Sequence, residues 1–265
     1  MRTPDLVVIS DLHLGHPCCR ATELLKYFET CRPLRLILAG DIMDLCDGRP
    51  WFWSRDQQRV LERIFRLAQT GVQVDYITGN HDRALARLRS LALGGINIQD
   101  KTDVTIGGRK YLVTHGDRFD KNRKFFSTLV RHGGGYIYDV GMAISQRIDR
   151  IRSWMGLSRL NLATRIKHIA PGVNTWLDTF INRAAQRTAA IGYDGLICGH
   201  LHVPDERWIE TAQGSFHYLN SGDWVEHASA LEFIDGSWTI HVPHHHKQSS
   251  AASNLNLGDE LPLAA

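Results

Sequence analysis

The sequence has few cysteines and no long apolar run. Its five cysteines are odd in number and lack CxxC spacing, so neither a disulfide framework nor a thiolate zinc site is indicated. No stretch approaches the roughly 18 to 20 apolar residues that a membrane-spanning helix needs, and the first residues lack the apolar core of a signal peptide. We therefore expect a cytoplasmic protein with reduced thiols. Disorder is excluded because 43% of the residues are hydrophobic.

Short apolar runs recur along the chain, and each one ends in a polar cluster. Helical spacing of apolar residues over 21–28 and 57–69 separates the first three runs, a pattern typical of an α/β fold with buried strands. Ligands of such sheets gather beyond the carboxyl ends of the strands. The five predicted strands and their clusters are 6–9 into SDLHLG, 34–38 into AGDIMD, 74–77 into TGNHD, 111–113 into THGD and 195–198 into GHLH.

The second half of the chain has a different pattern. From Lys101, and again after Pro204, short strands and turns predict a hairpin-rich second sheet that includes 216–220, 230–234 and 238–242. Between these parts, 119–191 has helical apolar stripes and no convincing strand, so we expect a helical cap insertion into one domain spanning 1–243. The Ser/Ala/Asn-rich segment 244–265 is expected to be a mobile tail.

The predicted cap is strongly basic. It holds 12 Lys and Arg against 4 Asp, a net +8, which leaves −5 for the rest of the +3 chain. This charge beside helical apolar stripes suits an anionic amphiphile or an anionic membrane face. A polynucleotide is a competing partner, and a solvated basic face over a local core is a third interpretation. We favour the lipid because the apolar side chains form helical stripes, whereas nucleic-acid stacking platforms commonly lie on strands.

The strand-end clusters are rich in metal-ligand residue types. Mixed imidazole and oxygen ligands suit manganese, iron or zinc, and so many candidates suit two ions about 3.5 to 4 Å apart that share a carboxylate, for which we expect Asp41. Each cluster alone could be a polar loop or a helix cap, but five at strand ends favour a metal site. Glycines precede three of the clusters and should let a turn approach the ions. The candidates are Asp11, His13, Asp41, Asn80, His81, His115, His200 and His202.

The ordered series D-x-H, G-D-x-x-D, G-N-H-D, H-G-D and G-H-x-H over residues 11–202 resembles the calcineurin-like metallophosphoesterase superfamily. The resemblance implies a sandwich of two mixed β-sheets flanked by helices, and a dinuclear site that commonly holds manganese, iron or zinc, of which we expect manganese. It places the first ion on Asp11, His13, Asp41 and His202. It places the second ion on Asp41, Asn80, His115 and His200.

The resemblance also implies a candidate catalytic pair. His81 would sit beside the substrate phosphate, oriented by Asp44. A hydroxide bridging the two ions would attack phosphorus while His81 protonates the leaving oxygen. Asp44 could instead be a helix N-cap.

The insertion and the segment 218–226 are similar to those of the UDP-2,3-diacylglucosamine pyrophosphatase-like branch. That branch cleaves a nucleotide-sugar-lipid pyrophosphate in lipid A biosynthesis, with the cap over the acyl chains, and it tends to have Arg where this chain has His81. Arg118 and Lys121 are candidate phosphate contacts, or surface charges. The 220–224 turn either approaches the site or only closes a hairpin.

The sequence therefore leaves three candidate functions. The first is a metallohydrolase that acts on an anionic phosphorylated lipid. It would lie in the cytoplasm or bind peripherally to the cytoplasmic face of the membrane. The second is a soluble phosphodiesterase or nuclease whose basic cap binds nucleic acid. The third, a noncatalytic metal-stabilised module, would require a lost ligand or a lost His81, and none is missing.

Overall fold

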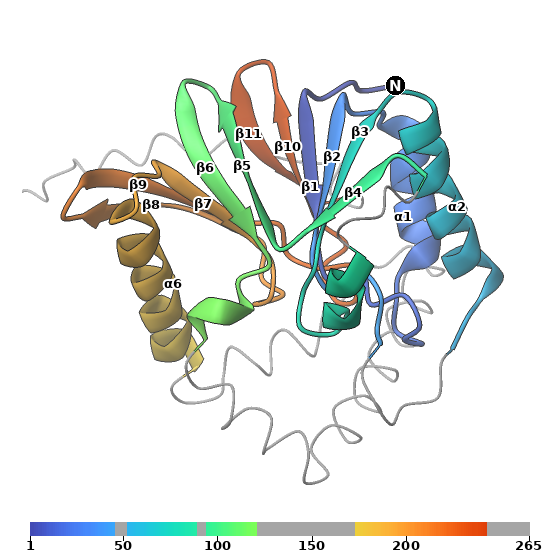
Figure 1. The fold of residues 1–265 in the computed structure, drawn as a ribbon, viewed down its shortest axis with the longest axis horizontal. Coiled ribbons are helices and arrows are strands. Elements are labelled where there is room, and N and C mark those ends of the chain that lie inside the picture. The colour runs from blue at the N-terminus through green and yellow to red at the C-terminus, as the bar shows by residue number, and fades with distance from the viewer. Residues whose placement is uncertain (46–51, 89–93, 121–172, 243–265) are drawn as a thin grey trace, which may run out of the picture.

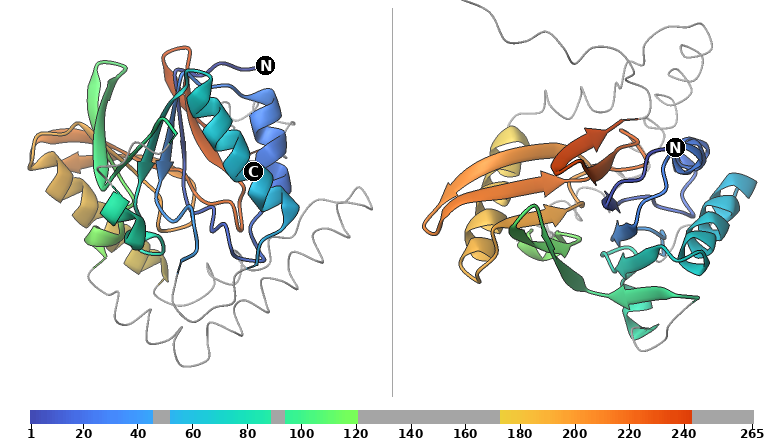
Figure 2. Two further views of the ribbon diagram at one scale, coloured as in Figure 1. Left: turned by 45° about the vertical axis from the view of Figure 1, so that its right-hand side comes forward. Right: turned by 90° about the horizontal axis from the view of Figure 1, so that it is seen from above.

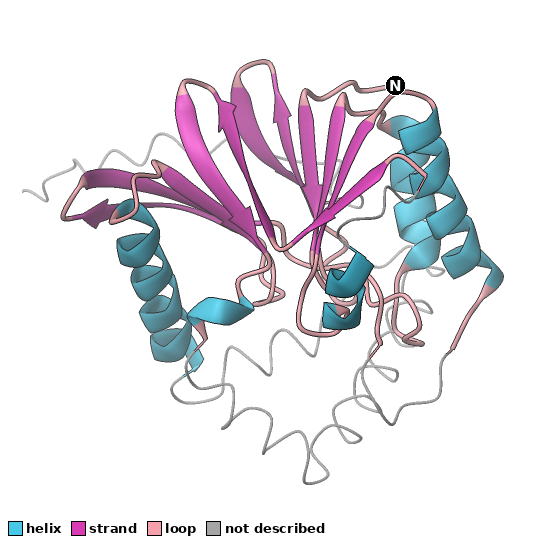
Figure 3. Ribbon diagram, viewed as in Figure 1, coloured by secondary structure: helices cyan, strands magenta, loops and turns pink. Residues whose placement is uncertain are grey.

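Two β-sheets pack face to face, with helices on their outer faces. The computed structural model describes residues 1–45, 52–88, 94–120 and 173–242. Figures 1 and 3 show α1 and α2 on one side and α6 on the other. The helices are α1 (Ala21–Thr30), α2 (Arg55–Gln69) and α6 (Val173–Ala189), with short 3-10 turns η1 (Arg83–Leu88) and η2 (Asp117–Phe119).

The first sheet has six strands in the order β11-β10-β1-β2-β3-β4. Neighbours from β1 to β4 are parallel, while β10 is antiparallel to both β1 and β11. The carboxyl ends of the parallel strands β1 to β4 therefore all lie at the same edge of the sheet. The strands are β1 (Leu6–Ile9), β2 (Arg35–Ala39), β3 (Gln73–Ile77), β4 (Ile96–Gln99), β10 (Ala230–Ile234) and β11 (Ser237–His241).

The second sheet has five strands in the order β5-β6-β7-β9-β8. Its three central strands, β6, β7 and β9, are parallel, and the edge strands β5 and β8 pair antiparallel. This sheet therefore also brings several strand ends to one edge. The strands are β5 (Lys101–Ile106), β6 (Arg109–Thr114), β7 (Gly195–Cys198), β8 (Asp205–Thr211) and β9 (Gly214–Asn220).

Alternation along the strands produces three apolar layers. Figure 2 shows from two further sides that α1 and α2 lie outside one sheet and α6 outside the other. In β1, Val7 and Ile9 join the layer under α1 and α2, whereas Leu6 and Val8 join the layer between the two sheets. The third layer lies between the second sheet and α6 and contains Phe180. Because successive side chains of a strand point to opposite faces, a fully apolar run such as 6–9 fits a strand covered on both faces.

Helix α2 follows from its local sequence. The Ser54 hydroxyl accepts the Gln57 N–H at 3.2 Å and caps the first turn. Val60, Ile64 and Leu67 recur at helical spacing and are buried against the first sheet. Ser54, and not Asp44, is therefore the N-cap of this helix.

All five expected strands are present, with small shifts at their ends. The hairpin β10–β11 was expected in the second sheet; that prediction is wrong, because β10 pairs with β1 and its Leu231 and Phe233 fill the layer between the sheets. Strand β4 was not predicted from its four residues.

Of the expected insertion, 173–189 is helical, while 121–172 and the tail lie outside the described residues. Among the described residues, no helix has the length and apolarity to cross a bilayer.

Candidate metal centre

The seven predicted metal ligands all follow the carboxyl ends of parallel strands. Residues after β1, β2 and β3 come from the first sheet, and residues after β6 and β7 come from the second. In Figure 1 these strand ends converge where the two sheets approach each other. The site is therefore assembled by packing one sheet on the other.

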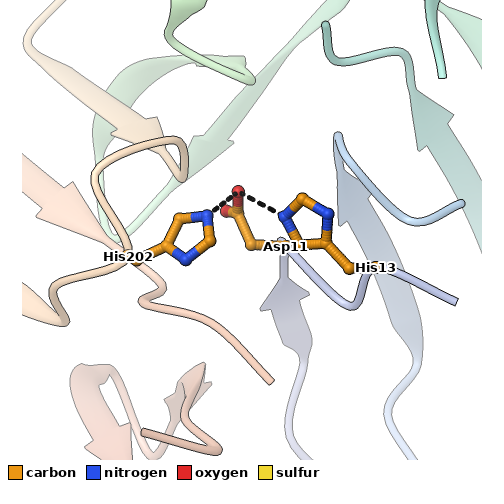
Figure 4. A group of neighbouring side chains, drawn as sticks. All are labelled: Asp11, His13 and His202. Atoms are coloured by element: carbon orange, nitrogen blue, oxygen red, sulfur yellow. Dashed lines mark ion pairs between the residues drawn. The ribbon is translucent and has the colours of Figure 1, made fainter. Parts of the chain in front are cut away.

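Asp11 lies between two histidines from different parts of the chain (Figure 4). Its Oδ1 is 3.1 Å from Nε2 of His202 and 4.0 Å from Nε2 of His13. Both imidazole nitrogens and the carboxylate oxygen lie within a radius that a single cation can span. This group matches three of the four ligands expected for the first ion.

A second group is built around Asp41 and His115. The Oδ2 of Asp41 is 3.2 Å from Nε2 of His115, and Asp11 completes this group. The Nδ1–H of His115 donates to the carbonyl of Ala39 at 3.1 Å, which turns Nε2 toward the carboxylates. Metal-binding histidines usually donate their other ring N–H to a carbonyl or a carboxylate in this way, which fixes the orientation of the ring.

Backbone hydrogen bonds fix one oxygen of each carboxylate. The Oδ2 of Asp11 accepts the His200 N–H at 3.0 Å, and the Oδ1 of Asp41 accepts the His81 N–H at 2.7 Å. The other oxygen of each carboxylate faces the imidazoles. These bonds also tie the loop after β7 to β1 and the loop after β3 to β2.

Asn80 and His200 complete the predicted set, with different surroundings. The Oδ1 of Asn80 is buried. The His200 ring lies 5.2 Å from the His115 ring, and its Nε2 is 3.6 Å from Oδ2 of Asp120. His200 is therefore beside the second group without sharing its close contacts.

Four predicted ligand atoms are buried and make no hydrogen bond, although two of them, Asp11 Oδ1 and His115 Nε2, lie close to an oppositely charged partner. Seven such side-chain atoms occur in the described part of the chain, and four of them belong to this site: Asp11 Oδ1, His13 Nε2, Asn80 Oδ1 and His115 Nε2. Buried polar atoms are nearly always hydrogen-bonded, and each exception calls for an explanation. Their gathering at one place fits ligands for a cation.

The backbone is strained at the same residues. Seven described residues other than glycine have left-handed φ angles, and five of them are predicted ligands: Asp11, His13, Asp41, His200 and His202, with φ from 48° to 68°. Such conformations cost about 1 to 3 kcal/mol each and cluster at functional sites. The strain turns each side chain out of its strand direction toward the centre.

The glycines before the clusters are required by space. A Cβ at Gly40 would collide with the His115 ring, one at Gly79 with Asp41, and one at Gly199 with Ser10 and Asp11. This confirms the expectation that glycine allows the loops to approach the site.

Charges at the site perturb one another strongly. Burial raises the pKa of Asp41, but His115, His81 and His13 outweigh burial and hold it well below the ordinary value. Burial lowers the pKa of His115 and His202, yet Asp41 and Asp11, respectively, raise each to about 10. Burial and His81 lower the pKa of His13 to about 4. Asp11 and Asp41 thus favour positive charge on His115 and His202, the histidines nearest to them.

His81 and Asp44 form a hydrogen-bonded pair. The His81 Nδ1–H donates to Oδ1 of Asp44 at 3.0 Å, and Nε2 lies 3.9 Å from Oδ2 of Asp41. Burial raises the pKa of Asp44, but the His81 hydrogen bond and His13 bring it down to about 2. The His81 side chain is 27% exposed, so a substrate can reach it.

The predicted phosphate contacts are less well placed. Arg118 is exposed and pairs with Asp100 at 3.2 Å, and Lys121 lies outside the described residues.

Sequence reasoning missed one buried carboxylate, Asp82, and left open whether the 220–224 turn, which carries a second one, Asp223, reaches the site. Asp82 accepts the Ile42 N–H at 2.8 Å and the Tyr76 hydroxyl at 2.6 Å, which anchors the loop after β2. Asp223 lies 3.2 Å from Nδ1 of His202. The signal for Asp82 was its place directly after G-N-H, and the signal for Asp223 was its place after another strand, β9.

Comparison with known proteins agrees with this geometry. The profile of the calcineurin-like phosphoesterase superfamily domain matches residues 5–137, half of the chain. A UDP-2,3-diacylglucosamine hydrolase of Aliivibrio fischeri is 24% identical over 251 residues, covering 89% of this chain and 97% of the relative. One of Chromohalobacter salexigens is 27% identical over 232 residues, covering 82% and 88%.

A solved phosphoesterase from E. coli aligns over 91% of this chain and 94% of its own, with 16% identity and a TM-score of 0.47.

Proposed function

The chain belongs to the calcineurin-like phosphoesterase superfamily and is a hydrolase, and from this premise we propose that it uses two divalent metal ions to hydrolyse a phosphoanhydride in a lipid-linked nucleotide sugar. The observation that carries the proposal is the convergence of the predicted ligands at the ends of five parallel strands, with four buried ligand atoms that make no hydrogen bond after three of these strands, β1, β3 and β6. Buried polar atoms are nearly always hydrogen-bonded, so four exceptions gathered at one place call for a common ligand.

The ligands divide between two ions. Asp11, His13, Asp41 and His202 would hold one, and Asp41, Asn80, His115 and His200 would hold the other. Manganese is the proposed metal, with iron or zinc as alternatives, because the ligands mix imidazole nitrogen and carboxylate or amide oxygen and include no thiolate. Two ions bound there would activate water and neutralise charge on the phosphoryl group.

His81 supplies the proton for the leaving oxygen. Its Nδ1–H is engaged by Asp44, so the proton it transfers is the one on Nε2. Asp44 orients the ring and stabilises its protonated form. A positioned acid of this kind contributes about 100-fold to 10,000-fold to a rate.

The substrate class rests on charge and on the relatives. The chain as a whole resembles proteins named UDP-2,3-diacylglucosamine hydrolase, and its 119–191 segment carries a net +8 with helical apolar stripes. Such a segment suits an anionic headgroup with attached acyl chains and peripheral contact with an anionic membrane. Arg118, just before this segment, and Lys121, near its start, are proposed to contact the phosphates.

The test is a substrate panel with manganese-reconstituted full-length protein. UDP-2,3-diacylglucosamine, a generic phosphodiester and a single-stranded polynucleotide would be compared by kcat/KM, with phosphorus NMR identifying the broken bond. We expect UMP and a diacylglucosamine phosphate as products, at a kcat/KM at least about tenfold above the other substrates. Preference for the polynucleotide would instead support a nuclease. Release of UDP would show that the phosphoanhydride is not the bond cleaved.

A further inference from the structure

A sixth parallel strand end reaches the site, and it delivers Asp223. Strand β9 runs parallel to β7, so the segment after it arrives at the same edge as His200 and His202. The Trp224 N–H donates to the carbonyl of Asp11 at 3.0 Å, which joins this segment to the loop after β1. Asp223 itself is completely buried.

Both oxygens of Asp223 are occupied by donors. Its Oδ1 accepts the backbone N–H of His227 at 2.8 Å and the Nδ1–H of the same residue at 2.9 Å. Its Oδ2 accepts the Glu226 N–H at 2.8 Å and lies 3.2 Å from Nδ1 of His202. The carboxylate is thus held rigidly by its own turn while it faces His202.

His202 therefore has its two ring nitrogens in different surroundings. Nε2 faces Oδ1 of Asp11 at 3.1 Å, inside the proposed metal centre, and Nδ1 faces Asp223 outside it. An ionised carboxylate only accepts hydrogen bonds. It consequently keeps the proton on Nδ1 and leaves the lone pair of Nε2 for a cation.

We propose that Asp223 is a positioning residue that fixes the ring orientation and the tautomer of His202 for metal binding. The inference rests on the proposed metal centre and adds a residue to it. Carboxylates that support metal-binding histidines typically change metal affinity by 10-fold to 100-fold when mutated. Asp223 faces Nδ1 of His202 and not Nε2, so its effect would pass through His202 and concern the ion that His202 would bind.

Asp223→Asn is the informative substitution. Asparagine has nearly the same shape, but it replaces one accepting oxygen with a donating amide. If the new oxygen faces His202, a neutral acceptor replaces the carboxylate and holds the Nδ1 proton less strongly. If the oxygen faces His227, the amide group faces Nδ1 of His202 and favours the tautomer that carries its proton on Nε2. That tautomer has no lone pair for a metal at Nε2.

The experiment measures Mn²⁺ binding to full-length protein by electron paramagnetic resonance. We expect two tight sites in the wild type, and in Asp223→Asn one site unchanged and one weakened by about 10-fold to 100-fold. Asp75→Asn is the matched control. Asp75, on β3, is also a buried carboxylate, but it pairs with Arg35 at 2.7 Å and not with a proposed metal ligand. This control should lower the melting temperature and retain both sites.

The possible outcomes distinguish the positioning role of Asp223 from the existence of the metal centre. Equal Mn²⁺ binding by the wild type and Asp223→Asn overturns the positioning role and leaves the metal centre intact. No tight Mn²⁺ in the wild type overturns both. If Asp223→Asn does not fold, nitrogen NMR of histidine-labelled, zinc-loaded wild type decides: we expect the proton of His202 on Nδ1, and zinc on that nitrogen would overturn the inference.

Discussion

His202 and Asp11 meet across the boundary between the two sheets, with Nε2 of His202 3.1 Å from Oδ1 of Asp11. Asp11 follows β1 of the first sheet, and His202 follows β7 of the second. The apolar layer between the sheets holds these strands together. The site therefore depends on the packing of the two sheets as well as on its own polar contacts.

Asp41→Asn is expected to remove bound metal and turnover while the fold remains. The new amide can still accept the His81 N–H through its oxygen, a bond now 2.7 Å long. It removes the negative charge that faces His115 at 3.2 Å. Metal content and phosphodiester hydrolysis by the purified variant check this prediction. Wild-type turnover in Asp41→Asn would contradict the assignment of Asp41 as the shared ligand.

His81→Ala is expected to keep its metal and lose rate. Removing the proton donor should lower kcat by about 100-fold or more, because the proposed ligands keep their contacts. Asp44→Asn should lower kcat by less, since the ring of His81 remains and its 3.0 Å partner loses only its negative charge. Steady-state kinetics with a parallel metal assay distinguishes the effects. A variant His81→Ala that has lost its metal would assign His81 a structural part in the metal centre.

Phe180→Ala is expected to destabilise the second sheet. Phe180 lies on α6, where it is buried against the second sheet, and its ring lies 6.1 Å from that of His200. Deleting a buried aromatic ring costs about 3 to 5 kcal/mol, measurable by urea unfolding. Asp178→Ala on the same helix is the control: its side chain is 57% exposed and pairs with Arg207, so a change of at most about 1 kcal/mol is expected. Equal losses in both variants would rule out the packing explanation.

The metal-free protein is expected to lose stability as the pH rises. Burial lowers the pKa of His115, but Asp41 raises it overall from 6.5 to about 10. A group whose pKa is raised by folding stabilises the folded state below its unfolded pKa and ceases to do so above its folded pKa. The melting temperature of chelator-treated protein should therefore fall between pH 6.5 and 10.

Two controls accompany this measurement. His115→Gln should show a smaller fall over the same pH range, and added Mn²⁺ at pH 9 should restore the melting temperature. A melting temperature that rises toward pH 10 would contradict the burial of protonated histidines among these carboxylates.

Much of the site could be predicted because its ligands are local to strand ends. An apolar run buried on both faces and then a polar cluster identifies the end of a parallel strand, and each cluster contains its own ligands. The pairing of His81 with Asp44 was likewise expected from the resemblance, and the two side chains are in contact.

Asp223 could not be assigned from its local sequence. The N-S-G-D segment reads equally well as a simple hairpin turn, and only the parallel pairing of β9 with β7 brings it to His202. The hairpin β10–β11 was misplaced for the same reason. The alternation of apolar and polar residues predicts two strands, but it does not predict which strand of the protein they pair with. In the structure β10 pairs with β1, with Leu231 opposite Val8.

The most direct test of the central claim is a titration of chelator-treated, full-length protein with Mn²⁺ while hydrolysis of a phosphodiester is followed. The account predicts no turnover without metal and a rate that reaches its plateau at two ions per chain. Turnover that persists in excess chelator, or a plateau at one ion per chain, would contradict a dinuclear phosphohydrolase.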